Sequence, residues 1–190
     1  MTFEEMKNLP VEEQIKLIKK LKKIRSQAKV VNFSATYGAG APKIAATLKC
    51  SIEEAKKLHK TYWTRNAAVK KTARACKVKT VDGQKWLYNP VSGFWMFLKA
   101  EKDRFSTLNQ STGVYVFDSW LRKVRAALNP MGIRVCMQYH DELLFVCKIH
   151  QKEEAENALK NAMEEANREL SLNVEIGVSV DWGLNYAECH

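Results

Sequence analysis

Apolar residues recur at helical spacing in two stretches of the first half of the chain. In residues 12–25 they stand three or four positions apart, and lysines fill most of the positions between them, which predicts an amphipathic helix. Residues 51–75 predict a further helical stretch, and Ser51 and Glu54 have the spacing of a capping box at its start.

Residues 25–37 have an ambiguous local pattern. Their β-branched and aromatic residues suit a strand. A helix is favoured because one set of side chains recurs at steps of four and would form a single stripe: Arg25, Lys29, Phe33 and Tyr37. Two glycines and Pro42 follow and supply the signal that ends a helix.

The later part of the chain mixes alternating and helical patterns. A turn signal at Val81-Asp82-Gly83-Gln84 predicts a small aromatic hairpin near residues 80–98. Farther on, the pattern predicts a helix over 107–128, two strands within 133–149, a helix over 152–170 and a last strand over 172–180. This order predicts an α+β fold, in which a helical portion is followed by an antiparallel sheet with packed helices.

Composition excludes several classes of protein. The chain has 190 residues, 46% of them apolar and 27% charged, which is typical of a globular protein and not of a disordered one. It has no apolar stretch long enough to span a bilayer and no secretory signal, so we expect a cytoplasmic protein. Its five cysteines form no C-x-x-C pair, which predicts reduced thiols and neither disulfides nor a zinc site.

The net charge of +10 is unevenly distributed. Residues 1–95 hold 20 basic and 7 acidic side chains, and residues 96–190 hold 11 and 14. A basic first half beside a slightly acidic second half is compatible with an ordinary solvated surface. It is equally compatible with a first half that contacts the phosphates of nucleic acid or nucleotides.

Two candidate sites stand out. The first is Gln138-Tyr139-His140-Asp141-Glu142, which places adjacent carboxylates at a tight turn between apolar strands. A divalent cation would relieve their repulsion, because hard ions bind carboxylate oxygens, although an ordinary polar turn is the alternative. The second is the stripe from Arg25 to Tyr37, where cations one turn apart can hold a polyphosphate and an aromatic ring can stack on a base. A solvated surface helix is the alternative there.

Together the two candidates resemble a known family. Arg25-Ser-Gln-Ala-Lys29-Val-Val-Asn-Phe33-Ser-Ala-Thr-Tyr37-Gly38 is similar to motif B, the fingers helix of family A DNA polymerases, and the sequence around His140-Asp141-Glu142 is similar to their palm motif C. Two weaker similarities agree: Gln110-Ser111-Thr112 with the start of the long palm helix, and the segment from Asp181 to His190 with the family's C-terminus. The phage members of the family look most similar.

The resemblance implies a role for each matching residue. Arg25 and Lys29 would bind the incoming dNTP, and Lys29 would also protonate the leaving pyrophosphate. Phe33 would pack on the nucleotide and Tyr37 would stack near the templating base. In the palm, Gln110 and His140 would contact the DNA primer-template, Asp141 would coordinate catalytic Mg²⁺, and Glu142 would assist less directly.

The resemblance also implies an organisation and a gap. Residues 1–100 would be a fingers-like portion and residues 101–190 a palm-like portion. A two-metal mechanism needs a second carboxylate, which the family takes from motif A, and no motif A is found in this sequence. We therefore expect the last portion of a polymerase, either a separate subunit or a fragment, whose Mg²⁺ site is incomplete without a partner chain that carries motif A and the thumb.

One position departs from the family's pattern, and two other functions are compatible with these residues. The family usually has an arginine eight residues before Gln110, where this sequence has Lys102, with Arg104 as a possible substitute. A non-catalytic DNA-binding remnant or accessory subunit with the same fold is the main alternative function. A metal phosphohydrolase that uses His140 and Asp141 is a weaker one, because it would need a second His and Asp cluster.

One prediction follows from the motif B similarity. In this family, phenylalanine at the position of Phe33 accompanies discrimination against dideoxynucleotides. In an enzyme completed by a partner chain, Phe33→Tyr is expected to ease dideoxynucleotide incorporation, because a hydroxyl is added beside the sugar. Chain-termination assays at fixed dNTP ratios measure this, and unchanged terminator sensitivity would contradict the alignment at Phe33.

Overall fold

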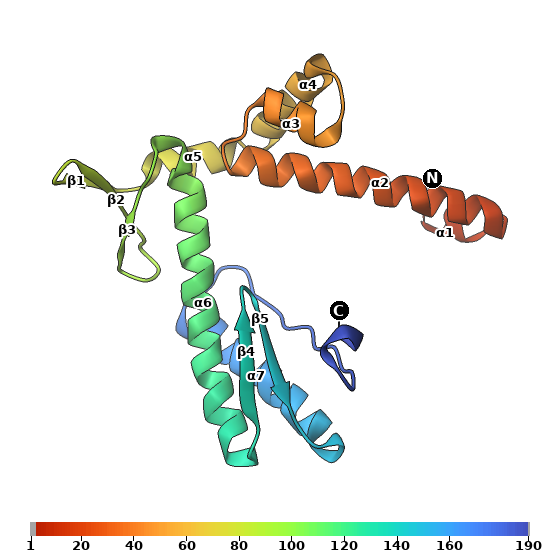
Figure 1. The fold of residues 1–190 in the computed structure, drawn as a ribbon, viewed down its shortest axis with the longest axis vertical. Coiled ribbons are helices and arrows are strands. Elements are labelled where there is room, and N and C mark those ends of the chain that lie inside the picture. Colours follow the sequence, from red (N-terminus) through yellow and green to blue (C-terminus); the bar gives the residue numbers. More distant parts are fainter. Residues whose placement is uncertain (1–2, 190) are drawn as a thin grey trace. The chain divides into compact units, whose positions relative to one another are not determined.

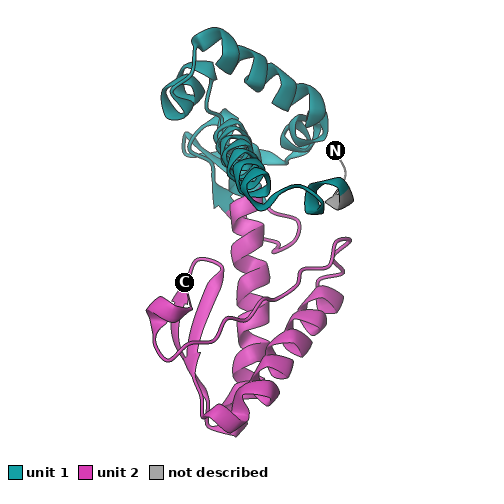
Figure 2. Cartoon of the chain, turned by 90° about the vertical axis from the view of Figure 1, so that its right-hand side faces the viewer, with its two compact units in different colours: residues 1–88, 96–108 teal, residues 89–95, 109–190 magenta. Residues whose placement is uncertain are grey.

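The computed structural model describes residues 3–189. The chain has a mixed α+β fold with small antiparallel sheets, as predicted. It divides into two compact units, the first formed by residues 1–88 and 96–108 and the second by residues 89–95 and 109–190 (Figure 2). The predicted division at residue 100 into fingers-like and palm-like portions is a functional one and stays a prediction.

The first unit is dominated by one long helix. After the short α1 (Phe3–Lys7), both stretches predicted between residues 12 and 37 join in α2 (Val11–Thr36), which contains neither glycine nor proline. The predicted end is confirmed, because the Tyr37 N–H still bonds to the Phe33 carbonyl at 3.0 Å while Gly38 turns away with φ 75°. That φ favours glycine.

Three shorter helices follow α2. They are α3 (Ala41–Leu48), α4 (Ile52–Arg65) and α5 (Ala67–Ala75), and α3 and α4 lie beside the end of α2 (Figure 1). The cap at Ser51 is confirmed, since its hydroxyl accepts the Glu54 N–H at 3.1 Å. The predicted run over 51–75 is broken at Asn66. The core between these helices consists of Val31, Ala35, Ile44, Ala55 and Tyr62.

A small three-stranded sheet also belongs mainly to this unit. Its strands are β1 (Val78–Val81), β2 (Gln84–Tyr88) and β3 (Trp95–Phe97), in the order β1-β2-β3. The predicted turn is confirmed: Asp82 and Gly83 have φ of 50° and 74°, which is the two-residue hairpin geometry that Asp-Gly favours. The sheet has one strand more than the predicted hairpin.

The second unit is built on two helices and a hairpin. They are α6 (Arg104–Leu128), which belongs to this unit from Asn109 on, α7 (Lys152–Glu169), and the antiparallel pair β4 (Arg134–Tyr139) and β5 (Glu142–Val146) (Figure 1). Short 3-10 helices, η2 (Asn129–Met131) and η3 (Ile149–Gln151), connect them. The core lies between α6 and α7, where the Trp120 indole N–H donates to the Leu159 carbonyl at 3.1 Å.

The predicted last strand over 172–180 is wrong. The segment is irregular, and the Asn167 side chain binds the Ile176 N–H and carbonyl at 3.0 and 2.9 Å in place of a neighbouring strand. Val178 and Val180 pack against the α6–α7 core, and Trp182 does the same. The alternation therefore matches packing only at Val178 and Val180, since Val174 and Ile176 are exposed, and it does not reflect a hydrogen-bonded ladder. The segment ends at η4 (Tyr186–Glu188), and His190 lies outside the described residues.

Asn89 joins the loop after β2 to α6. It is fully buried, and its amide donates to the hydroxyls of Ser111 and Thr112 at 2.8 and 3.1 Å. Its oxygen accepts the Val91 N–H at 2.9 Å. One side chain thus satisfies polar groups of two segments that meet inside the second unit.

Among the described residues, no helix has the length and apolar character needed to cross a membrane.

Asn89→Ala is expected to lower the free energy of unfolding by about 2 kcal/mol, because the Ser111 and Thr112 hydroxyls and the Val91 N–H each lose one partner and a cavity forms where a buried side chain stood. Asn161→Ala, at an exposed position of α7, serves as the control and should change it by less than about 0.5 kcal/mol. Urea unfolding followed by circular dichroism measures both. Equal stability of the two variants would show that the Asn89 bonds contribute nothing net.

Candidate functional site

The predicted stripe lies on one side of α2. Arg25, Lys29, Phe33 and Tyr37 are all exposed, with Phe33 at 58% and Tyr37 at 41%. Steps of four residues rotate by only about 40° around a helix, so these side chains stay on a common face. The opposite face carries Val31 and Ala35, which are buried against α3 and α4. The structure thus brings the four predicted residues together and leaves them accessible.

The end of this helix is held from two directions. The Thr36 hydroxyl and the Tyr62 hydroxyl of α4 form a 2.5 Å hydrogen bond, and Tyr62 is buried. On the other side, the Lys102 stem lies against Gly38, where an added Cβ would come within 3.3 Å of the lysine Cδ. These contacts fix the position of Phe33 and Tyr37 at the C-terminal turn of α2.

The structure distinguishes Lys102 from Arg104. Glu101 accepts from Lys85 Nζ and from Arg104 Nε, both at 2.6 Å. The hydrogen bond from Lys85 comes first among the causes that lower the pKa of Glu101. Arg104 is therefore engaged within an ion-pair cluster, whereas Lys102 lies beside the end of α2. Of the two candidates for the family's arginine position, Lys102 is the one next to the predicted nucleotide-binding helix.

The second candidate site is the turn between β4 and β5. Tyr139 and Glu142 pair across the hairpin, so His140 and Asp141 form its two-residue loop. His140 has φ 54°, a left-handed conformation that costs energy for any residue with a Cβ. Its ring lies 4.4 Å from that of Tyr139. The predicted hairpin is confirmed, and the loop leaves both His140 and Asp141 exposed.

Glu142 lies in a different environment from Asp141. It is half-buried, and the Tyr186 hydroxyl of η4 is hydrogen bonded to it. Burial, followed by the charge of Glu142, raises the pKa of Tyr186. No sequence pattern identified Tyr186, because the contact joins residues that are far apart in the chain.

The carboxylates at the turn offer the oxygen ligands that Mg²⁺ prefers. Within residues 3–189, however, no three His, Cys, Asp or Glu side chains converge as a metal-binding group. The chemistry of the donors thus fits Mg²⁺, whereas their number does not complete a site within the described part of the chain.

Gln110 lies on the exposed side of α6, directly before the residues that bind Asn89. It belongs to the second unit, together with His140, Asp141 and Glu142. The predicted site residues thus form two groups: the α2 stripe in the first unit, and the hairpin turn with Gln110 in the second.

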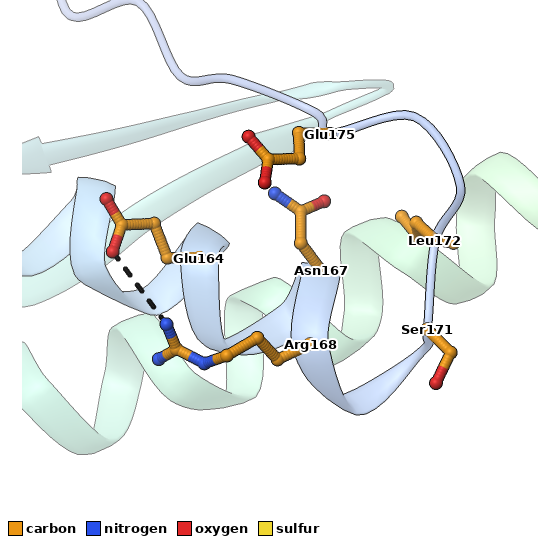
Figure 3. A pocket seen from close by; sticks show the side chains of 6 residues that line it. All are labelled: Glu164, Asn167, Arg168, Ser171, Leu172 and Glu175. Atoms are coloured by element: carbon orange, nitrogen blue, oxygen red, sulfur yellow. Dashed lines mark ion pairs between the residues drawn. The ribbon is translucent and has the colours of Figure 1, made fainter.

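A hollow of about 440 Å³ at the end of α7 contains none of the predicted site residues (Figure 3). An ion pair between Glu164 and Arg168, 4.0 Å apart, lies along it, and Asn167 is occupied by the backbone of Ile176. Half of its lining side chains are thus engaged in structural contacts; the full lining is Glu164, Asn167, Arg168, Ser171, Leu172 and Glu175.

Comparison with known proteins identifies the family. The family model for DNA polymerase family A matches residues 6–188. The chain belongs to this family. It is 28% identical over 171 residues to the thermostable DNA polymerase I of Thermus filiformis, an alignment that covers 84% of this chain and 20% of the relative.

Other relatives are similarly distant. The chain is 28% identical over 177 residues to DNA polymerase I of Caldicellulosiruptor bescii, covering 87% of this chain and 20% of that protein. It is 22% identical over 172 residues to DNA polymerase theta of Caenorhabditis elegans, covering 86% and 11%. The family A chain thus spans about a fifth of the length of the bacterial relatives. The expected similarity to phage members stays a prediction.

A solved structure shares the fold. It is the POL domain of Pol1 from M. smegmatis in complex with DNA primer-template and dNTP, with a TM-score of 0.59 and 24% identity. The match covers 75% of this chain and 27% of that one. At this identity the match shows a common fold with a polymerase domain.

The α2 stripe leads to a binding prediction. Lys29→Ala is expected to weaken nucleoside triphosphate binding by about tenfold, because it removes one charge-assisted hydrogen bond to phosphate. Lys20→Ala is the matched control, since Lys20 is exposed on the same helix but nine residues away, which is half a turn round. Fluorescence titration with a labelled dNTP measures both affinities. Equal losses would indicate unspecific attraction to a basic helix.

Proposed function

We propose that this chain is the C-terminal part of a DNA-directed DNA polymerase that extends a primer by template-directed nucleotidyl transfer. One observation carries the proposal: a family A chain presents an exposed cationic and aromatic helix face together with a separate exposed carboxylate turn. The first suits a nucleoside triphosphate and the second suits metal ions. The POL domain with the same fold is a complex with DNA primer-template and dNTP, which supports those ligands here.

In this proposal α2 handles the incoming nucleotide. Arg25 and Lys29 lie one turn apart and bind neighbouring phosphates of a dNTP, and Lys29 gives a proton to the departing pyrophosphate. Phe33, exposed one turn further on, packs on the sugar and base. Tyr37, at the end of the helix, stacks near the templating base. The buried contacts of Val31 and Ala35 hold this face in place.

The hairpin turn handles the primer end. Asp141 holds catalytic Mg²⁺ together with a carboxylate from outside the described residues, and Glu142 assists less directly. When bound, the two ions lower the barrier by favouring the deprotonated primer hydroxyl and by offsetting charge on the leaving phosphates. His140 contacts the primer strand near its 3′ end, and Gln110 contacts the minor groove of the nascent base pair.

The missing ligands come from a partner chain that carries motif A and the thumb. An uncovered apolar surface supports a partner: Ile15, Ile18, Leu21 and Ile24 on α2 are 40–50% exposed. Aliphatic side chains at this density on one helix favour contact with another polypeptide. We place the assembled enzyme in the cytoplasm, which for a phage-encoded chain is that of the host.

Primer extension with and without the partner tests this function. The chain alone is expected to extend no primer, and addition of a polypeptide that carries the preceding palm and thumb is expected to restore extension. Asp141→Ala should reduce the restored rate about a hundredfold or more, because a metal ligand is lost. Asp118→Ala, which removes an exposed carboxylate of α6 in the same unit, is the control and should keep the rate.

Two results would contradict the proposal. Extension by the chain alone that Asp141→Ala abolishes would show that no partner is needed. A complemented mixture that binds DNA with steep salt dependence, but neither extends a primer nor binds dNTP with Mg²⁺, would favour the non-catalytic alternative. The strongly basic first half of the chain would then account for DNA binding by itself.

A further inference from the structure

We propose that the C-terminal segment from Trp182 to Cys189 braces the carboxylate turn, with Tyr186 as a positioning residue that holds Glu142 so that Asp141 is presented to the reacting groups. The bracing is a property of the second unit alone. Its consequence for catalysis rests on the polymerase function proposed above.

The brace is anchored at Trp182. The Trp182 indole N–H donates to Glu156 Oε2 on α7 at 3.1 Å. Its ring meets Phe145 of β5 edge to face at 5.6 Å, and Lys152 Nζ lies 5.1 Å from the ring centre. One half-buried side chain therefore joins the segment to α7 and to the same hairpin that carries the turn.

The chain after Trp182 folds tightly on itself. A Cβ added at Gly183 would come within 2.5 Å of the Glu188 Cβ and 3.2 Å of the Cys189 Sγ, so only glycine fits at this position. Glu188 closes the loop, because its carboxylate accepts the Leu184 N–H at 2.8 Å and the Asn185 side-chain amide at 2.6 Å. These contacts fix the direction of η4 (Tyr186–Glu188) relative to its anchor.

The brace reaches the turn through Tyr186. The C-terminal segment lies beside the turn end of the β4–β5 hairpin in both ribbon views (Figures 1 and 2). The Tyr186 hydroxyl is hydrogen bonded to the Glu142 carboxylate, and Tyr139 lies close enough to influence it. Glu142 pairs with Tyr139 to close the two-residue loop, so a hydrogen bond to Glu142 bears directly on the loop geometry.

This contact separates the roles of two adjacent carboxylates. The Glu142 carboxylate accepts a hydrogen bond from the Tyr186 hydroxyl of the C-terminal segment. Asp141, in contrast, is exposed at the loop. A hydrogen bond to Glu142 also disperses part of its charge, which reduces the repulsion between the neighbouring carboxylates. Tyr186 thereby favours the loop conformation in which Asp141 is free to bind a cation.

Amide hydrogen exchange in the isolated chain tests the brace. In Tyr186→Phe, the amides of residues 139–143 are expected to exchange about five- to tenfold faster, which corresponds to the loss of one hydrogen bond of ordinary strength at a partly exposed site. Tyr115→Phe is the matched control, because it removes a hydroxyl from a half-exposed tyrosine of α6 in the same unit. Exchange at the turn that is unchanged in Tyr186→Phe would overturn the brace.

Kinetics in the complemented enzyme test the consequence. Tyr186→Phe is expected to lower kcat about five- to tenfold and to leave the KM for dNTP within about twofold, since positioning of Asp141 acts on the chemical step. Tyr115→Phe should change neither constant. If the variant loses thermal stability and active fraction but keeps kcat per active site, Tyr186 is structural only and the positioning role is wrong.

The two proposals fail separately. Suppose that the wild-type chain extends no primer with its partner, while amide hydrogen exchange at the turn still depends on Tyr186. The brace is then supported and the polymerase function is wrong. If extension is restored but Tyr186→Phe matches wild type in both exchange and kcat, the function stands and the brace falls.

Discussion

The hairpin that carries Asp141 depends on the packing of α6 against α7. Two antiparallel strands are marginally stable by themselves, because they bury too little apolar surface to offset the entropy of ordering them. Here Val135, Leu143 and Phe145 lie against the core that the two helices form. The exposed turn at the end of the strands is therefore supported by buried residues. The polar residues of the turn do not themselves have to pack in the core.

In α2, too, buried residues support the helix while exposed residues form the candidate site. The C-terminal half of α2 buries Val31 and Ala35 against α3 and α4. The side chains on the opposite face do not contribute to this core. Arg25, Lys29 and Phe33 can therefore be exposed at little cost to stability. At the end of the helix, the Thr36–Tyr62 hydrogen bond and the Lys102 stem at Gly38 limit fraying. Both candidate sites are thus exposed side chains on buried supports.

The sequence predicted what depends on neighbouring residues. The spacing of apolar positions located α2, α6 and α7, and the Asp82-Gly83 pair located a turn whose backbone has the expected positive φ angles. The α3 helix was missed, although Pro42 in its first turn and Ile44 at its centre are compatible with one. Pro42 was interpreted as part of the signal that ends the preceding helix, but α2 has already ended at Thr36 and Pro42 lies in the first turn of α3.

What the sequence did not predict depends on contacts between distant segments. The alternation over residues 172–180 predicted a strand, but no neighbouring strand is present in the described chain to pair with it, and a sequence pattern does not reveal whether a pairing partner exists. Asn89 and Tyr186 had no local signal, since an asparagine or tyrosine is buried or exposed according to partners elsewhere in the fold. The residues of α2 and of the hairpin turn were identified from their spacing and charge, and the family resemblance then suggested a role for each of them.

Charge connects the two sites physically. The basic excess lies in the first 95 residues, with α2, while the hairpin turn lies in the slightly acidic remainder. A triphosphate would be attracted to Arg25 and Lys29 and repelled by Asp141, so the α2 stripe and the turn suit ligands of opposite charge. The turn offers carboxylate oxygens, which suit a divalent cation, and the stripe offers cations, which suit phosphates. The signs of the charges therefore agree with the division of roles in the proposed function, in which the helix face binds the nucleotide and the turn binds metal.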